Sequence, residues 1–233
     1  MKNLAIIPAR SGSKGLPDKN IKLLNGHPLM WYSIKAALES GCFDEVMVST
    51  DSMEYAEIAK ESGAAVPFLR SAEMSRDDIS TWDAVREVLT NYQEQGRMFD
   101  TVMLLQPTSP LRTAEDIVNA YNMLKQKNAR SIVGMCEVEH SPLWSNNLPS
   151  DRSLECFIRP EISEISCRQK LPVFYRINGA IYLHKLSYDN LKFDLYSSDG
   201  FAYIMPQQKS IDIDTELDFI MAESIMKYDL DKK

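Results

Sequence analysis

The chain has 233 residues, of which 44% are hydrophobic and 25% are charged, and its formal net charge is −7. This is the composition of an ordinary soluble globular protein with a large core, either one large domain or one domain with a smaller lobe. The acidic balance argues against general nucleic-acid binding, because neutralising phosphates needs a basic face, so any anion site must be a local basic pocket.

The apolar pattern predicts alternating strands and helices over the first part of the chain. Short buried runs of strand type occupy residues 4–7, 46–50, 101–105 and 131–138, and stretches with helical spacing occupy residues 27–40, 53–62, 80–92 and 114–126. Gly63 is a natural end for the second helix, a serine or threonine opens the third, and Thr113 caps the fourth. The alternation predicts an α/β fold, with a mostly parallel twisted sheet and helices on both faces.

The pattern weakens between residues 140 and 172, a segment rich in proline, serine and charge. This segment is compatible with a disordered stretch, a lid, or an arm that meets another subunit. Strands are predicted again at 178–185 and 201–206, and an amphipathic helix at 215–228. We therefore expect a main domain, residues 1–139 and 173–233, and a small arm, residues 140–172.

The loop after the first strand has the composition of an anion site. It reads IIPARSGSKGLPDKN, and its two glycines let backbone N–H groups approach an anion closely. Ser11 and Ser13 add hydroxyl donors, and Arg10, Lys14 and Lys19 add charge-assisted donors for phosphate oxygens. Ligands of parallel sheets bind at the carboxyl ends of the strands, which is where this loop lies. The alternative is a solvated surface loop with scattered charge.

A second candidate site lies in SIDIDTELD, near the end of the sequence. Asp212 and Asp214 alternate with Ile211 and Ile213, so an extended chain would direct both carboxylates to one side and both isoleucines to the core. Two neighbouring carboxylates repel unless a cation neutralises them, and such oxygen ligands suit Mg²⁺. Alternatively, the aspartates are cap and turn residues before the last helix, which Thr215 can cap.

Two further stretches present polar side chains beside predicted strands. In LLQPTSPLRT, Gln106 can offer its amide to a polar ligand, and Arg112 is a candidate for an anion contact or a local salt bridge. In RQKLPVFYRINGAIYL, Arg168 and Arg176 can pair with a carboxylate, although a charged edge strand explains the same residues.

Several function classes are disfavoured. The chain contains neither a Walker A string nor a complete dinucleotide fingerprint. The three histidines form no pair at ligand spacing, the four cysteines form no C-x-x-C pair, and no G-x-S-x-G sequence occurs. The start, MKNLAIIPAR, lacks the apolar run of a signal peptide, and no stretch approaches the roughly 20 apolar residues of a membrane helix. We expect a cytoplasmic protein with reduced thiols and no membrane partner.

Taken together, these stretches resemble the N-acylneuraminate cytidylyltransferases, or CMP-sialic acid synthetases. The family pattern ARxxSKGLPxKN appears as ARSGSKGLPDKN, and LLQPTSPLRT, RQKLP, NGAIY and SIDIDTELD follow in the family's order, so that the resemblance spans residues 3–228. It implies a Rossmann-like nucleotidyltransferase that transfers CMP from CTP to the anomeric hydroxyl of a nonulosonic acid, a nine-carbon keto acid, and releases pyrophosphate. It also implies a homodimer joined through residues 140–172.

The resemblance further implies roles for individual residues. The nucleotide-binding residues would be Arg10, Ser11, Ser13, Lys14, Lys19, Asn20, Arg70 and Thr81. Of these, Arg10 and Lys19 would neutralise charge on the α- and β-phosphates, and Arg70 and Thr81 would hold the cytosine and ribose. The sugar-binding residues would be Gln106, Arg168, Arg176, Asn178 and Tyr182. Asp212 and Asp214 match the family's metal-binding aspartates, for Mg²⁺ or a substituting Mn²⁺, and Arg10, Lys19 and Asp214 are the candidate catalytic residues.

The resemblance leaves open which nonulosonic acid is the acceptor. N-acetylneuraminate is favoured, with legionaminic, pseudaminic and deaminated sialic acids as alternatives. Some sialic acid members carry a lysine near the sugar where this chain has Trp144, which cannot supply a positive charge. This change indicates either a different nonulosonic acid, such as legionaminic acid, or a rearranged arm. A catalytically inactive nucleotide-sugar-binding homologue is the non-enzyme alternative.

Overall fold

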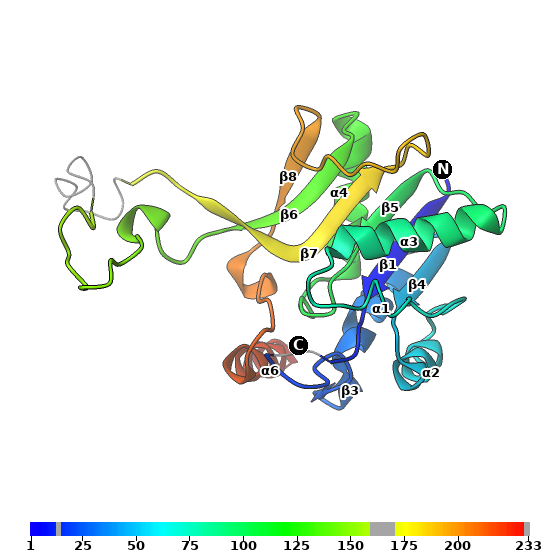
Figure 1. Ribbon diagram of the computed structural model, residues 1–233, viewed down its shortest axis with the longest axis horizontal. Coiled ribbons are helices and arrows are strands. Elements are labelled where there is room, and N and C mark those ends of the chain that lie inside the picture. The colour runs from blue at the N-terminus through cyan, green and yellow to red at the C-terminus, as the bar shows by residue number, and fades with distance from the viewer. Residues whose placement is uncertain (13–14, 159–170, 231–233) are drawn as a thin grey trace.

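The predicted strands assemble into a twisted six-stranded sheet in the computed structural model, which describes residues 1–12, 15–158 and 171–230 (Figure 1). The strands are β1 (Asn3–Pro8), β4 (Glu45–Ser49), β5 (Thr101–Leu104), β6 (Ser131–Glu137), β7 (Tyr175–Lys185) and β8 (Gly200–Ile204), and their order is β4-β1-β5-β7-β6-β8. Only β7 runs antiparallel to its neighbours among these described strands. The predicted mostly parallel sheet is confirmed.

Helices cover both faces of the sheet, as predicted. α1 (Leu29–Ser40), α2 (Met53–Glu61) and α4 (Ala114–Gln126) pack on one face, and α3 (Thr81–Glu94) packs on the other. The alternation of side chains along β1 separates the two cores, because Ala5 and Ile7 join the first helix group while Leu4 and Ile6 join α3.

Two of the predicted helix starts have identifiable caps. α4 begins at Ala114, because the backbone N–H and the hydroxyl of Thr113 both donate to the Asp116 carboxylate, at 2.9 and 2.7 Å. α3 begins after Ser80, whose hydroxyl oxygen accepts from the N–H of Trp82 at 3.2 Å. Both helices therefore occupy nearly the predicted residues.

α1 begins later than predicted, because a short hairpin takes up the preceding residues. β2 (Leu23–Leu24) and β3 (His27–Pro28) pair antiparallel across Asn25 and Gly26, whose φ angles are 44° and 84°. An Asn-Gly pair favours such a two-residue turn, since both positions are left-handed.

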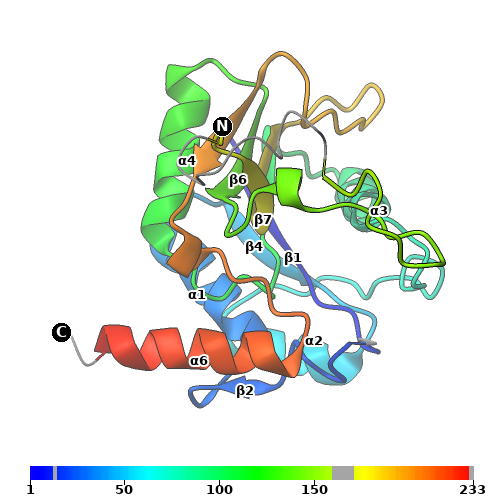
Figure 2. The same ribbon diagram turned by 90° about the vertical axis from the view of Figure 1, so that its left-hand side faces the viewer.

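The last helix, α6 (Glu216–Leu230), packs on this hairpin in a separate small core (Figure 2). That core includes Leu24, Leu29, Phe219 and the fully buried Ile213. The predicted inward direction of the isoleucines is thus confirmed, and the packing fixes the aspartate-bearing segment beside the opening loop.

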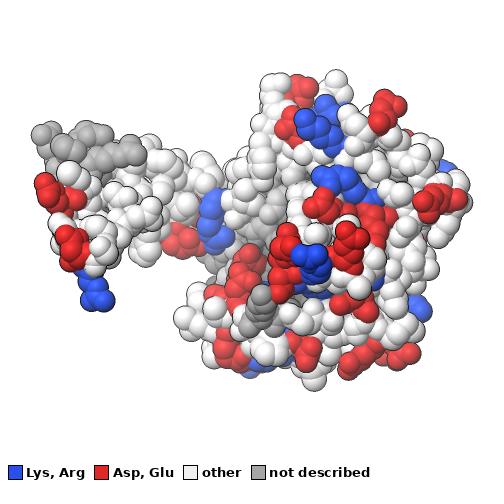
Figure 3. Space-filling model, in the orientation of Figure 1, with Lys and Arg blue, Asp and Glu red and all other residues white. Residues whose placement is uncertain are grey.

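The segment between β6 and β7 projects from the body as an arm (Figure 1). Its first part contains a 3-10 helix, η1 (Pro142–Trp144), and residues 159–170 lie outside the described part. Trp144, Leu148 and Leu154 are 41%, 55% and 71% exposed. In Figure 3 the arm stands clear of the body, and its described surface on this side is mostly uncharged.

No helix in the described ranges is long and apolar enough to cross a membrane.

Candidate functional site

The carboxyl ends of β1, β4 and β5 meet at one edge of the sheet, where a cavity of about 550 Å³ opens. Its lining residues are Pro8, Arg10, Gly15, Lys19, Asn20, Arg70, Thr81, Gln106, Pro107, Thr108, Asp214 and Thr215. The cavity therefore brings together seven residues that the sequence predicted for the site: Arg10, Lys19, Asn20, Arg70, Thr81, Gln106 and Asp214. It lies where open α/β sheets bind their ligands.

Arg10 follows β1 after one intervening residue, Ala9, and reaches toward the segment before α3. Its Nη1 donates to the backbone oxygen of Ser75 at 3.3 Å and pairs with an oxygen of Asp77 at 2.7 Å. Asn20, which is 5% exposed, donates its amide to the backbone oxygen of Arg10 at 3.0 Å. The two ends of the opening loop are thereby held together.

Ser11 is engaged by a residue that the sequence analysis did not single out. Its backbone N–H and its hydroxyl both donate to the carboxylate of Asp51, at 2.8 and 2.9 Å. Asp51 follows β4. Its carboxylate at the end of a predicted parallel strand is the sequence signal that could have marked it as a site residue. The predicted nucleotide ligands Ser13 and Lys14 lie outside the described residues.

Lys19 joins the opening loop to the aspartate segment. Its ammonium donates to the Asp214 carboxylate and to the backbone oxygen of Ile213, both at 2.9 Å. Gly15 contacts the same segment, since a Cβ on it would lie 2.8 Å from the backbone oxygen of Asp214. This close approach leaves no room for a side chain at Gly15.

Arg70 and Thr81 border a smaller adjoining cavity of about 230 Å³, which Arg10 also lines. Arg70 is 9% exposed and donates to the hydroxyl and backbone oxygens of Ser49, at 3.1 and 3.0 Å. Burial lowers the pKa of this guanidinium. Thr81 is the first residue of α3. The smaller cavity therefore presents cationic and hydroxyl groups beside the larger one.

Arg112 lies beneath the cavity and acts as an internal cross-link. It donates to the backbone oxygen of Ala180 at 2.7 Å, to that of Gln106 at 3.0 Å and to the hydroxyl of Ser33 at 2.9 Å. Full burial lowers its pKa to about 10. The sequence left two roles open for Arg112, an anion contact and a local salt bridge. The described contacts of Arg112 include neither, because its acceptors are backbone and hydroxyl oxygens.

Three of the predicted sugar ligands, Arg176, Asn178 and Tyr182, lie on β7. None of them lines the cavity at the sheet edge. Asn178 is 1% exposed, and its amide donates to the hydroxyl of Ser210 at 3.0 Å. Arg176 forms a 2.8 Å ion pair with Glu139. Tyr182 is half-buried, and burial raises its pKa to about 12. Arg168 lies outside the described residues.

Asp212 is partly buried, and the charges of Lys19 and Arg176, which lower the pKa of its carboxyl, act on it together with that of Asp214. Burial raises the pKa of its carboxyl, and the nearby charge of Asp214 raises it further. One of its oxygens, Oδ1, is buried and has no hydrogen-bond partner in the described structure. Such a buried oxygen next to a second carboxylate fits a divalent cation. The described residues contain no group of three acidic, histidine or cysteine side chains suited to a metal, so other ligands would complete the coordination.

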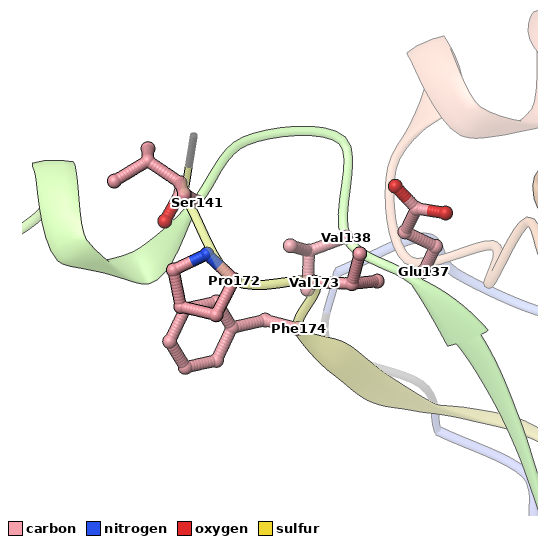
Figure 4. Close-up of a pocket in the computed structure, with 7 residues that line it drawn as sticks. Glu137, Val138, Ser141, Pro172, Val173 and Phe174 are labelled. Atoms are coloured by element: carbon pink, nitrogen blue, oxygen red, sulfur yellow. The ribbon is translucent and has the colours of Figure 1, made fainter. Parts of the chain in front are cut away.

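Another cavity, of about 400 Å³, lies at the root of the arm (Figure 4). Glu137, Val138, Ser141, Leu171, Pro172, Val173 and Phe174 line it. These side chains are mostly apolar, and none is a predicted site residue, so we place the candidate site in the cavity at the sheet edge.

The mostly parallel sheet, with basic side chains in a cavity at its carboxyl edge, is a Rossmann-like α/β arrangement. Solved structures share this fold. A CMP-2-keto-3-deoxy-manno-octonic acid synthetase complexed with CTP gives a TM-score of 0.71 at 16% identity, over 98% of this chain and 100% of that chain. A 4-diphosphocytidyl-2C-methyl-D-erythritol synthase from Anaerococcus prevotii gives 0.60 at 14% identity, over 97% and 98%.

The family model described as "Cytidylyltransferase" matches residues 4–226, and the chain therefore belongs to the cytidylyltransferase family. It is 39% identical to a CMP-N,N'-diacetyllegionaminic acid synthase of Legionella pneumophila, over 97% of both chains. It is 38% identical to an N-acylneuraminate cytidylyltransferase of Streptococcus agalactiae, over 94% of this chain and 52% of the relative, so it spans about half of that protein. A pseudaminic acid cytidylyltransferase of Campylobacter jejuni is 33% identical over 97% of both.

Proposed function

We propose that the protein transfers CMP from CTP to the anomeric hydroxyl of a nonulosonic acid, releases pyrophosphate, and works as a cytoplasmic homodimer. The observation that carries the proposal is the single cavity that gathers Arg10, Lys19, Arg70 and Asp214 within a cytidylyltransferase fold.

In this reaction the anomeric oxygen attacks the α-phosphorus, and the bond from that phosphorus to the β-phosphate oxygen breaks. Negative charge grows on the α-phosphate oxygens and on the departing pyrophosphate. Arg10 and Lys19 line the cavity from one loop, and cations fixed in advance stabilise the transition state more than the ground state. Arg70 and Thr81, beside the smaller cavity, would hold the cytosine and the ribose.

Asp212 and Asp214 would hold a Mg²⁺, or a substituting Mn²⁺. When bound, such an ion neutralises phosphate charge and lowers the pKa of the attacking hydroxyl. The partner-free oxygen of Asp212 and its electrostatic coupling to Asp214 support this assignment.

Two acceptors are each favoured by a specific observation. The Legionella relative is named for diacetyllegionaminic acid and is matched over nearly its whole length. Trp144 stands where some sialic acid enzymes carry lysine, which indicates either a different nonulosonic acid, such as legionaminic acid, or a rearranged arm. N-acetylneuraminate is favoured by the Streptococcus relative, which is almost as similar. We propose diacetyllegionaminic acid as the first acceptor to test and N-acetylneuraminate as the second.

The test is a panel of acceptors with purified protein, CTP and Mg²⁺, in which pyrophosphate release is followed. Sialic, deaminated sialic, legionaminic and pseudaminic acids are compared, and UTP replaces CTP in a parallel series. We expect release only with a nonulosonic acid. Each base-edge contact left unpaired costs about 1–3 kcal/mol, so two such contacts predict at least about a thirtyfold preference for CTP over UTP. Release from CTP without an acceptor, or no release with any acceptor, would contradict the proposal.

A further inference from the structure

The two cations proposed to act on the phosphates already have carboxylate partners. Lys19 pairs with Asp214, which belongs to the site as a proposed metal ligand. Arg10 pairs with Asp77, a residue with no role in the reaction described so far. Asp77 lies in the segment that joins Arg70 to Thr81, the two residues proposed to hold the nucleoside.

The contacts of Arg10 divide its guanidinium into two sides. Nη1 alone donates to the backbone oxygen of Ser75 at 3.3 Å and meets Asp77 Oδ1 at 2.7 Å. A guanidinium carries five N–H donors in a fixed planar fork, so contacts at one nitrogen restrict where the other donors lie. The edge formed by Nε and Nη2 takes no part in either contact, and Arg10 lines both cavities. That edge is the one suited to a phosphate.

We propose that Asp77 is a positioning residue, which holds the Arg10 guanidinium so that its other edge meets the α-phosphate of CTP. The inference rests on the proposed function. Asp77 lines the smaller cavity together with Arg10, and in this proposal it acts through Arg10.

The pair is too exposed to be explained as a support for the fold. The side chains of Arg10 and Asp77 are 32% and 44% exposed, and ion pairs in contact with solvent contribute little to folding stability. If Asp77 merely competed with the phosphate for Arg10, its removal would have the opposite kinetic effect. CTP would bind more tightly, and kcat would not fall.

The neighbouring residue supplies a matched control. Asp78 forms a 2.7 Å ion pair with Arg76, and both side chains are more than 60% exposed, at 64% and 63%. Asp78→Ala therefore removes a carboxylate and an ion pair from the same segment without touching Arg10.

The experiment compares kcat and the KM for CTP in the wild type, Asp77→Ala, Asp78→Ala, Arg10→Ala and the Arg10→Ala/Asp77→Ala double variant. Misplacing a reacting group by about 1 Å can cost about a hundredfold, so we expect Asp77→Ala to lower kcat by about tenfold to a hundredfold. The KM for CTP should not rise, because a negative charge near the phosphates is removed. Asp78→Ala should match the wild type, and the double variant should match Arg10→Ala within about twofold, since the two residues act as one unit.

The possible results separate the two proposals. A wild type that turns over no CTP with any acceptor removes the proposed function and this inference together. An active wild type overturns the inference alone if Asp77→Ala keeps full kcat, or if Asp77→Ala lowers kcat further in the Arg10→Ala background. A thermal melt of each variant accompanies the kinetics, and a large fall in Tm for Asp77→Ala alone would assign the residue to folding and overturn the inference.

Discussion

Lys19 connects two regions that are far apart in the sequence. Its ammonium donates to the Asp214 carboxylate and to the backbone oxygen of Ile213, and its side chain is only 15% exposed. This grip fixes a positive charge in the cavity before any nucleotide arrives. A cation held in this way needs little reorganisation during the reaction.

Lys19→Ala should therefore act mainly on kcat. Loss of one preorganised donor costs about 2.7–4 kcal/mol, roughly a hundredfold to a thousandfold in rate. Lys22→Ala is the control, because Lys22 pairs with Glu216 on α6 and does not line the cavity. Steady-state kinetics with CTP varied at saturating acceptor distinguishes the outcomes. If Lys19→Ala altered KM but left kcat normal, Lys19 would contribute to CTP binding and not to the chemical step.

Asp212 and Asp214 should be needed for metal binding even without turnover. Losing an outer partner of a metal ligand already costs about 10–100-fold in affinity, so losing a ligand should weaken Mn²⁺ binding by at least about a hundredfold. Calorimetric titration of Mn²⁺ into Asp212→Asn and Asp214→Asn measures this directly.

Asp189→Asn, which changes an exposed aspartate remote from the cavity lining, should bind Mn²⁺ as the wild type does. Unchanged Mn²⁺ affinity in the double variant Asp212→Asn/Asp214→Asn would refute the metal assignment.

At the scale of elements, β7 is shaped by an irregularity beside the site. Its pairing with β6 shifts register between Val133 and Met135, and Gly179 lies there with a φ of 74°. A Cβ on Gly179 would lie 2.2 Å from the Oε1 of Gln106. The irregular part of β7 therefore lies in close contact with Gln106, a residue of the cavity.

Gly179→Ala should destabilise the fold and disturb Gln106. An alanine in left-handed backbone costs about 1–2 kcal/mol, and forcing a methyl group into a packed space adds about 1–3 kcal/mol. Gly96→Ala tests the first cost alone, because Gly96 has a φ of 72° and a Cβ on it would meet nothing within 4 Å. Urea unfolding gives both free energies. Equal losses in the two variants would mean that the contact with Gln106 carries no cost.

The sequence predicted most elements because their signals are local. The buried runs of β1 and β5 and the Thr113 cap of α4 each depend on a few neighbouring residues. The β2–β3 hairpin was missed although Asn25 and Gly26 carried its signal, because the apolar spacing after residue 27 suggested helix.

Only part of the candidate site could be predicted from the sequence. The carboxyl edge and the seven cavity residues followed from loop position and from the family resemblance. The carboxylates that hold Arg10 and Ser11 did not, since Asp77 and Asp51 come from distant segments. The hydrogen bond from the Asn178 amide to Ser210 was not predicted either, because only the tertiary structure joins these two residues.

At the scale of the whole molecule, the arm exposes apolar side chains that the body does not cover. Leu148 and Leu154 are 55% and 71% exposed, and Val173 at the arm's root is 58% exposed. Exposed apolar surface of this kind usually marks an interface. A second copy of the chain is the partner that we expect.

Sedimentation at micromolar concentration should therefore detect a dimer, and Leu154→Asp should shift it toward monomer by placing a charge in the interface. Leu217→Asp is the matched control, because Leu217 is 65% exposed but lies on α6, away from the arm. A monomeric wild type, or a dimer that only Leu217→Asp weakens, would contradict an interface through the arm.

The proposed function requires that the anomeric oxygen of a keto-sugar acid attacks the α-phosphorus of CTP in the cavity at the sheet edge. Its most direct test is phosphorus NMR of a reaction in which that oxygen carries a heavy isotope. We expect the label to be retained in the bridge between sugar and CMP, with unlabelled pyrophosphate formed in equal amount. Label appearing in pyrophosphate, or CMP formed without a sugar ester, would contradict this chemistry.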